Sequence, residues 1–202
     1  MDEVGANKYC ELMKEVKNRV FSINLVLDGK CTLGFVPVNA EFVYLQFRKI
    51  LELVAFGSLI ANFKTYSKVR SDYSRDWKAT RFLKNIEQVN KKFYPDPVEH
   101  RQLEGQLPFR NFEAFEGDYL TMEEFKVLYD VCGGFMHSEN PYGDTHKYAE
   151  LLEKAPVWLN KIVNLLNLHI VNFVDGTGCL IQMGDNDMQV SFAIFGPVIN
   201  TP

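Results

Sequence analysis

The stretch AEFVYLQFRKILELVAFGSLIANFKTY, from Ala40 to Tyr66, largely determines the architecture of this 202-residue chain. Apolar residues occur on most sides of the helix that it predicts, and a helix that is apolar all round lies at the centre of a protein. Asn39 precedes the stretch and is a good N-cap. Four small residues within the stretch allow a neighbouring helix to approach closely: Ala55, Gly57, Ser58 and Ala61. We therefore expect a central buried helix over about residues 40 to 66.

One further helix is predicted before this central helix in the sequence, and one after it. Apolar residues at helical spacing indicate a first helix from about residue 7 to 27, which Asp28-Gly29 ends by turn chemistry. A third helix is expected over about 75 to 91, with Asp72 or Ser74 as its cap. The segment FYPDPV ends that helix, because two prolines prevent its continuation.

The second half of the chain predicts two more helices after an irregular segment. Residues 95 to 119 are expected to be irregular and to lie on the surface, anchored by three aromatic residues: Phe109, Phe112 and Phe115. Thr121 and Glu124 form a capping box that starts the fourth helix. Asp144 or Thr145 caps the fifth, which reaches about Asn167. Pro156 falls inside it and predicts a kink or a restart.

The tail changes to short β-rich runs, HIVNFV, GCLIQM and MQVSFAIF, separated by DGTG and GDND. Such runs joined by turn-forming residues predict hairpins, and hence a three-stranded antiparallel meander over about 169 to 196. The expected fold is mainly α, α+β overall, with a five-helix bundle and a C-terminal three-stranded antiparallel β meander. We expect residues 1–168 to form the helical domain and 169–202 an appendage packed on it.

The bulk composition excludes several classes of protein. A net charge of −4 argues against an extended electrostatic interface with nucleic acid, although a local basic strip lies between Lys64 and Lys92. The four cysteines are widely scattered and match no zinc pattern, so we expect no metal and buried, reduced thiols. No signal-peptide pattern and no membrane-spanning run is present. The sequence predicts a cytoplasmic protein without a cofactor.

Two charged residues stand out on the apolar central helix. Arg48 and Glu52 lie four residues apart, so they share one face. Ionised groups inside a core are costly unless they are paired. Either the two residues form structural ion pairs, with each other or with other helices, or they line a polar pocket that binds a ligand.

The stretch LTMEEFKVLYDVCGGFMHSENPY, from Leu120 to Tyr142, supplies the second part of the candidate site. The fourth helix leads through Gly133-Gly134 to His137. This histidine serves either as a helix C-cap donor or, because its pKa lies near neutrality, as a catalytic proton-transfer group. The polar loop that follows includes Asn140, which we expect to help hold a ligand.

The charged pair within FRKILEL and the late helix ending in FMHSEN resemble the HEPN superfamily over residues 7 to 168. The resemblance implies a small cytosolic helical bundle, typical of prokaryotic toxin–antitoxin and phage-defence systems. Many members of that superfamily are metal-independent RNases with an Arg-x4-6-His motif, and many dimerise so that two motifs meet. Here Asp130, Val131 and Cys132 occupy the positions that would need the arginine, so the guanidinium that would hold the scissile phosphate is absent.

These observations favour a HEPN-like binding or interaction protein that engages RNA, a nucleotide or a protein partner near Arg48, Glu52 and His137. The first alternative is a metal-independent RNase with His137 as general acid or base. The second is a structural dimerisation module with the β meander as its interface. We also expect a homodimer, because a three-stranded tail leaves strand edges that invite pairing.

Overall fold

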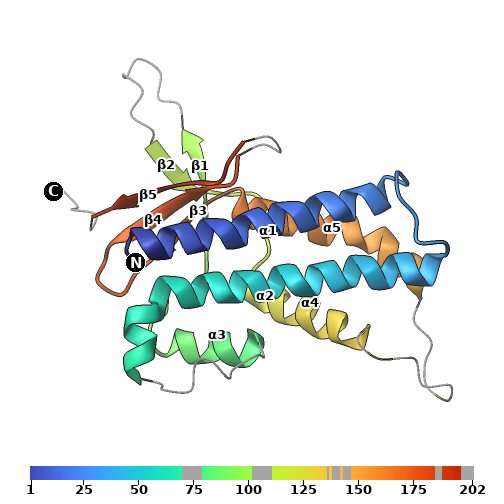
Figure 1. Ribbon diagram of the computed structural model, residues 1–202, viewed down its shortest axis with the longest axis horizontal. Helices are drawn as coiled ribbons and strands as arrows, with labels where there is room; N and C mark the ends of the chain where they lie inside the picture. Colours follow the sequence, from blue (N-terminus) through green and yellow to red (C-terminus); the bar gives the residue numbers. More distant parts are fainter. Residues whose placement is uncertain are drawn as a thin grey trace.

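The computed structural model of this chain is mainly helical, with five helices and one five-stranded antiparallel sheet in its described part (Figure 1). The structure describes residues 1–69, 79–101, 111–135, 137, 142, 147–184 and 188–196. In Figure 1 the helices form a bundle, and the sheet lies at one end of it. The mixed, mainly helical class is as predicted. The sheet, however, has five strands and not three.

Two long helices, α1 (Glu3–Leu27) and α2 (Val36–Val69), lie side by side (Figure 1), and α2 occupies the centre of the bundle. The helix α1 starts slightly before the expected position, because the Asp2 carboxylate accepts a hydrogen bond from the backbone N–H of Gly5. It ends where the sequence predicts, at the turn that contains Gly29 with a φ of 68°. The helix α2 contacts each of the other four described helices, which confirms its central position.

The expected N-cap role of Asn39 is wrong, because α2 begins three residues earlier, at Val36. Asn39 instead fixes the α1–α2 connection. Its side-chain oxygen accepts from the backbone N–H of Leu33, and its amide donates to the Thr32 hydroxyl. Pro37 lies in the first turn of α2, where a proline needs no backbone hydrogen-bond partner. The start of the helix is therefore set by proline geometry, and asparagine holds the preceding loop.

The small residues of α2 do allow a close approach. A Cβ atom added to Gly57 would lie 2.8 Å from Cε2 and 3.2 Å from Cζ of Tyr9 on α1. Tyr9 is almost fully buried. Its ring therefore lies directly against the backbone of α2, as the run of small residues predicted.

Replacing Gly57 by alanine is expected to destabilise the protein by about 1 to 3 kcal/mol, although alanine favours a helix. The Tyr9 ring has little freedom to move away, because its hydroxyl is hydrogen-bonded inside the core. Gly133→Ala is the matched control, since a Cβ there meets only Arg48 Nη1 at 3.6 Å. Urea unfolding should show Gly133→Ala as neutral or slightly stabilising. Equal effects of the two substitutions would contradict the close packing at Gly57.

The other three helices are α3 (Ala79–Glu87), α4 (Met122–Gly134) and α5 (Tyr148–Leu166). The capping box at the start of α4 is confirmed: Glu124 N–H donates to Thr121 Oγ1, and Thr121 N–H donates to the Glu124 carboxylate. Pro156 lies inside a continuous α5, which does not restart there. The expected caps of the third and fifth helices, Asp72, Ser74, Asp144 and Thr145, lie outside the described residues.

The sheet contains β1 (Asp96–Arg101), β2 (Asn111–Ala114), β3 (Leu168–Asn172), β4 (Gly178–Gln182) and β5 (Ser191–Phe195) in the order β2-β1-β3-β4-β5. The meander β3-β4-β5 is as predicted. The expectation that residues 95–119 are irregular is wrong, because β1 and β2 form a hairpin within them. Of the three expected aromatic anchors, Phe112 lies on β2, Phe115 follows it half-buried, and Phe109 lies outside the described residues.

One face of the sheet packs on the helices. Alternate residues of β3 and β4 are buried on that face, namely His169, Val171, Cys179 and Ile181. A buried amide network adds a polar link between bundle and sheet: the Asn90 amide donates to Asn62 Oδ1 on α2 at 2.8 Å and to the carbonyl of Asn172 on β3 at 2.9 Å. The sheet therefore shares one hydrophobic core with the bundle.

Candidate functional site

Arg48 and Glu52 form the ion pair that their spacing on α2 predicts. Arg48 Nε lies 3.1 Å from Glu52 Oε1, and the two side chains are 19% and 22% exposed. Lys49 Nζ lies 3.5 Å from the other carboxylate oxygen of Glu52. The carboxylate is thus shared between two cations at the edge of the core.

The guanidinium of Arg48 also joins α2 to α4 through Tyr129. Arg48 Nη1 donates to the backbone carbonyl of Tyr129 at 3.1 Å, and Nη2 donates to its hydroxyl at 2.5 Å. The carbon Cζ of Arg48 lies 3.3 Å from the centroid of the Tyr129 ring, which adds a cation–π contact. We call Arg48, Glu52 and Tyr129 the arginine cluster.

Every nitrogen of the guanidinium has a partner within the arginine cluster. A phosphate would have to compete with the Glu52 carboxylate for this cation. The planar fork that recognises a phosphate bidentately is occupied by the protein itself. The arrangement is suited to holding α2 against α4 and offers little charge to a ligand.

His137 follows α4, whose C-cap is Phe135, and its side chain is exposed. The described residues include no hydrogen bond or ion pair between His137 and either Arg48 or Glu52. Along α2 the contacts of α4 run toward the helix start: Tyr129 lies at Arg48, and Phe135 stacks on Tyr44 with ring centroids 4.8 Å apart. Asn140, the expected ligand-holding residue, lies outside the described residues.

This end of the bundle carries exposed apolar side chains. The α1–α2 connection, the end of α4 and the start of α5 lie together there, opposite the sheet (Figure 1). Phe35 is 63% exposed, and Leu33 and Val36 are also exposed. Tyr142, between α4 and α5, is almost fully exposed. We call Leu33, Phe35 and Val36 the bundle-end surface.

A second polar site, which the sequence did not predict, lies inside the core. His169 on β3 is fully buried, and its Nε2 lies 2.9 Å from the Tyr9 hydroxyl of α1. Its Nδ1 lies 2.8 Å from the Leu166 carbonyl, which can only accept, so Nδ1 carries the hydrogen and Nε2 accepts from Tyr9. Burial lowers the pKa of His169 to about 4, so the ring is neutral. The available sequence signal was its alternation with Val171 on one strand face.

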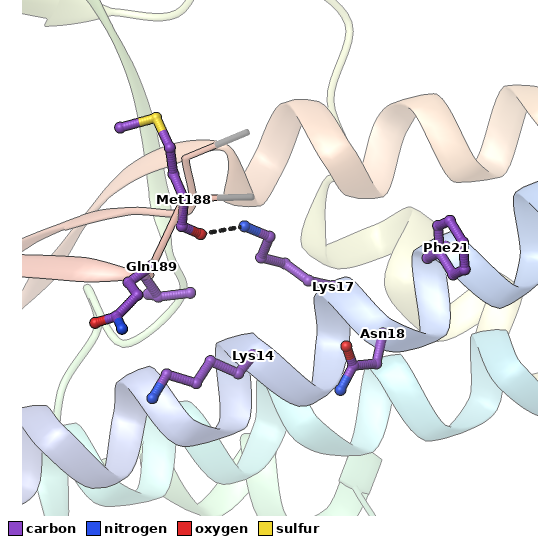
Figure 2. A pocket seen from close by; sticks show the side chains of 7 residues that line it. Lys14, Lys17, Asn18, Phe21, Met188 and Gln189 are labelled. Carbon is purple, nitrogen blue, oxygen red and sulfur yellow. Dashed lines mark hydrogen bonds between the residues drawn. The ribbon is translucent and has the colours of Figure 1, made fainter. Parts of the chain in front are cut away.

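A hollow with a volume of about 440 Å³ lies between α1 and residues 188–190, which precede β5. Figure 2 shows Lys17 crossing from α1 to the Met188 carbonyl, with Lys14 and Gln189 on one side and Phe21 on the other. Lys17 also donates to the Met183 carbonyl, and Lys14 pairs with Glu11 at 2.6 Å. Both ammonium groups are thus bound by the protein, and the hollow offers no ready anion site.

Basic residues outside these clusters give little support for a nucleic-acid surface. Three residues of the basic strip between Lys64 and Lys92, namely Arg70, Arg75 and Lys78, lie outside the described residues. Lys64 itself lies 3.3 Å from the Asp2 carboxylate. In the described part of the chain, no helix has the length and apolar character needed to cross a bilayer. The same residues contain no group of three or more acidic, histidine or cysteine side chains placed to hold a metal.

Comparison with protein-family models, with curated proteins and with solved structures found no match to this chain.

Proposed function

We propose that this chain is a non-catalytic binding protein of HEPN-like build that engages a protein partner. The observation that carries the proposal is the arginine cluster. Its guanidinium donates to Glu52 and twice to Tyr129. The arginine of the candidate site that could otherwise bind a phosphate is therefore held by other residues of the protein.

Ribonuclease chemistry at His137 would need a cation beside the scissile phosphate. The motif positions on α4 offer none: Asp130 is exposed and would repel the phosphate, and Cys132 is fully buried. Burial raises the pKa of the Cys132 thiol to about 12, so this group stays neutral at pH 7. An exposed imidazole without a phosphate-binding partner is a poor catalyst, because proton transfer contributes only part of the rate.

A protein partner fits the exposed surface better than RNA or a nucleotide does. The bundle-end surface presents three exposed aliphatic or aromatic side chains at the α1–α2 connection and the start of α2. Aromatic and aliphatic groups are typical of the centres of protein interfaces, whereas RNA binding needs an excess of positive charge. The chain instead has a net charge of −4.

Purified protein is expected to show no RNA cleavage in EDTA beyond that of a buffer control. His137→Ala should not differ from the unchanged protein, because no described cation prepares the phosphate for proton transfer. The measurement is the decay of a fluorescent single-stranded RNA at pH 7. Cleavage that disappears in His137→Ala but persists in His100→Ala would instead establish the ribonuclease alternative.

The partner surface can be tested by quantitative co-purification of the tagged chain from its own cells. Phe35→Asp should lose a protein that the unchanged chain retains, because an aspartate cannot fill an apolar interface. Val174→Asp is the matched control, since Val174 is 52% exposed and lies in the β3–β4 turn, away from the bundle-end surface. Equal retention by all three proteins would remove the bundle-end surface as the binding site.

A further inference from the structure

The strand β5 ends the sheet with an unprotected edge. It pairs with β4 on one side, and none of the residues that the structure describes pairs with its other side. The unpaired edge of a strand presents backbone N–H and C=O groups that only another strand satisfies in regular fashion. The binding partner that suits this edge is therefore a polypeptide segment in an extended conformation.

The composition of β5 lacks the usual protection against pairing. Its sequence, SFAIF, contains no charge and no proline, the two common devices that blunt a natural edge strand. The strand at the other edge of the sheet, β2, carries Glu113. The two edges are thus built differently, and only β5 is made of neutral and apolar residues.

The helices bury the inner face of the sheet as far as β4, but they cover β5 only in part. Cys179 of β4 is fully buried, yet its partner in register, Ile194, is 47% exposed although it points to the same face. Phe192, opposite the fully buried Ile181, is only partly covered. A neighbouring strand with apolar side chains at the matching positions would complete this layer.

We infer that β5 pairs antiparallel with β5 of a second copy of this chain, which joins two five-stranded sheets across a two-fold axis near Ala193. In that register Phe192 lies opposite Ile194 of the second copy, and Ala193 lies opposite its own equivalent. The half-exposed Ile194 gains an aromatic neighbour on the helix-covered face. Cross-strand pairs of aromatic and β-branched residues are among those that stabilise sheets.

A second copy fits this edge better than an unrelated strand, because the pairing is self-complementary and closed. Both copies offer the same neutral residues, so no like charges meet across the axis. Lys14, which lies near the start of β5 in the hollow of Figure 2, is already paired with Glu11 and adds no uncompensated charge. Pairing of β2 with β5 would instead build an open filament, and the carboxylate of Glu113 opposes it.

The dimer does not depend on the proposed function, since β5 and the bundle-end surface lie at different ends of the bundle (Figure 1). The test is the mass of the full chain by sedimentation over about 1 to 100 µM, where a stable pair shows by mass action. The expected mass is twice the 23.3 kDa of one chain. Ile194→Lys should raise the dissociation constant at least about 100-fold, because it places a charge against Phe192 of the second copy.

Val174→Lys is the matched control, with the same kind of change at a similarly exposed valine away from β5. It should leave the dimer intact. A monomeric wild-type chain, a dimer that survives Ile194→Lys, or equal loss in both variants would overturn the inference. Hydrogen exchange of the unchanged protein gives a second readout that does not depend on a variant folding. Within residues 191–195, the backbone amides that point away from β4 should lose protection on dilution, and protection of those amides that is independent of concentration would also overturn the inference.

Discussion

Acidification from about pH 7 to about pH 4 is expected to lower the free energy of unfolding by about 3 kcal/mol through His169 alone. The ring is fully buried and neutral, and burial lowers its pKa in the folded protein to about 4, from an ordinary value of 6.5. In the unfolded chain the same group binds a proton below about pH 6.5. The unfolded state therefore binds more protons between these two values, and stability falls as the pH falls through them.

The stability that neutral His169 contributes is fully present at pH values above the pKa of this group in the unfolded chain. It is lost as the pH falls to the pKa of the group in the folded protein. The groups that face the ring do not supply a counter-charge: Tyr9 donates its hydroxyl, and the Leu166 carbonyl accepts from Nδ1. Burial raises the pKa values of Tyr9 and of nearby Cys179, so both stay neutral throughout this range. Protonation would place a cation in the core against the donating hydroxyl of Tyr9.

Urea unfolding of the unchanged protein and of His169→Gln at several pH values isolates this effect from that of the carboxylates. Glutamine does not titrate, so the advantage of the histidine should shrink steadily between pH 7 and pH 4. The exposed His100 gives the control, and His100→Gln should keep the pH dependence of the unchanged protein. A constant difference between the unchanged protein and His169→Gln across the range would show that His169 is not buried and neutral.

Replacement of Arg48 by alanine is expected to destabilise the protein by about 2 to 4 kcal/mol, because it leaves partly buried partners without their donor. The Tyr129 carbonyl and hydroxyl each lose a hydrogen bond, and Glu52 keeps only the longer contact with Lys49. Arg48→Lys should recover less than half of the loss, since an ammonium cannot reproduce the planar fork and its stacking. The measurement is the midpoint of urea unfolding at pH 7.

Arg19 is the control for this experiment. It also pairs with a glutamate four residues away on a helix, Glu15, but the two side chains are 25% and 45% exposed. Its other partner is the side chain of Gln46, and no backbone carbonyl is involved. Arg19→Ala should therefore cost about 1 kcal/mol or less. If both arginine variants lose the same amount, the arginine cluster has no special part in holding α2 to α4.

The elements that the sequence predicts correctly are those with strong local signals. The apolar character of α2 indicated its central position, and the Thr121–Glu124 box marked the start of α4 to the residue. The turn residues between β3, β4 and β5 separated the strands of the meander. In each case the signal lies within one short stretch of the sequence.

The hairpin β1–β2 was missed because its residues lack the propensity for strands. The segment DPVEHR contains a proline and three charged or titratable residues beyond it, and it is a strand because its residues pair with β2 and with β3. Only Asp96 and Pro97 pair with β3, opposite Ile170 and His169. This pairing joins positions more than seventy residues apart, and no local pattern contains it.

In the candidate site, too, features that depend on local sequence could be predicted, whereas contacts between distant residues could not. The spacing of Arg48 and Glu52 placed both on one face and made their ion pair one of the alternatives, since that pair depends only on one helix. Tyr129 was not predicted as their partner, because its position beside Arg48 follows from the packing of α4 on α2. His169 was not predicted as a buried polar residue, because its partner Tyr9 lies 160 positions earlier in the chain.

That separation has a consequence for synthesis on the ribosome. Tyr9 is made 160 residues before His169 on β3, the acceptor of its hydroxyl, and Lys17 is made 171 residues before Met188, whose carbonyl it binds. A nascent chain that ends before β3 holds α1 with one apolar face uncovered. Contacts between distant positions form slowly, because long loops must close first. The helices therefore remain incompletely packed until β3, β4 and β5 have been made, and during that interval the chain is exposed to aggregation and to chaperones.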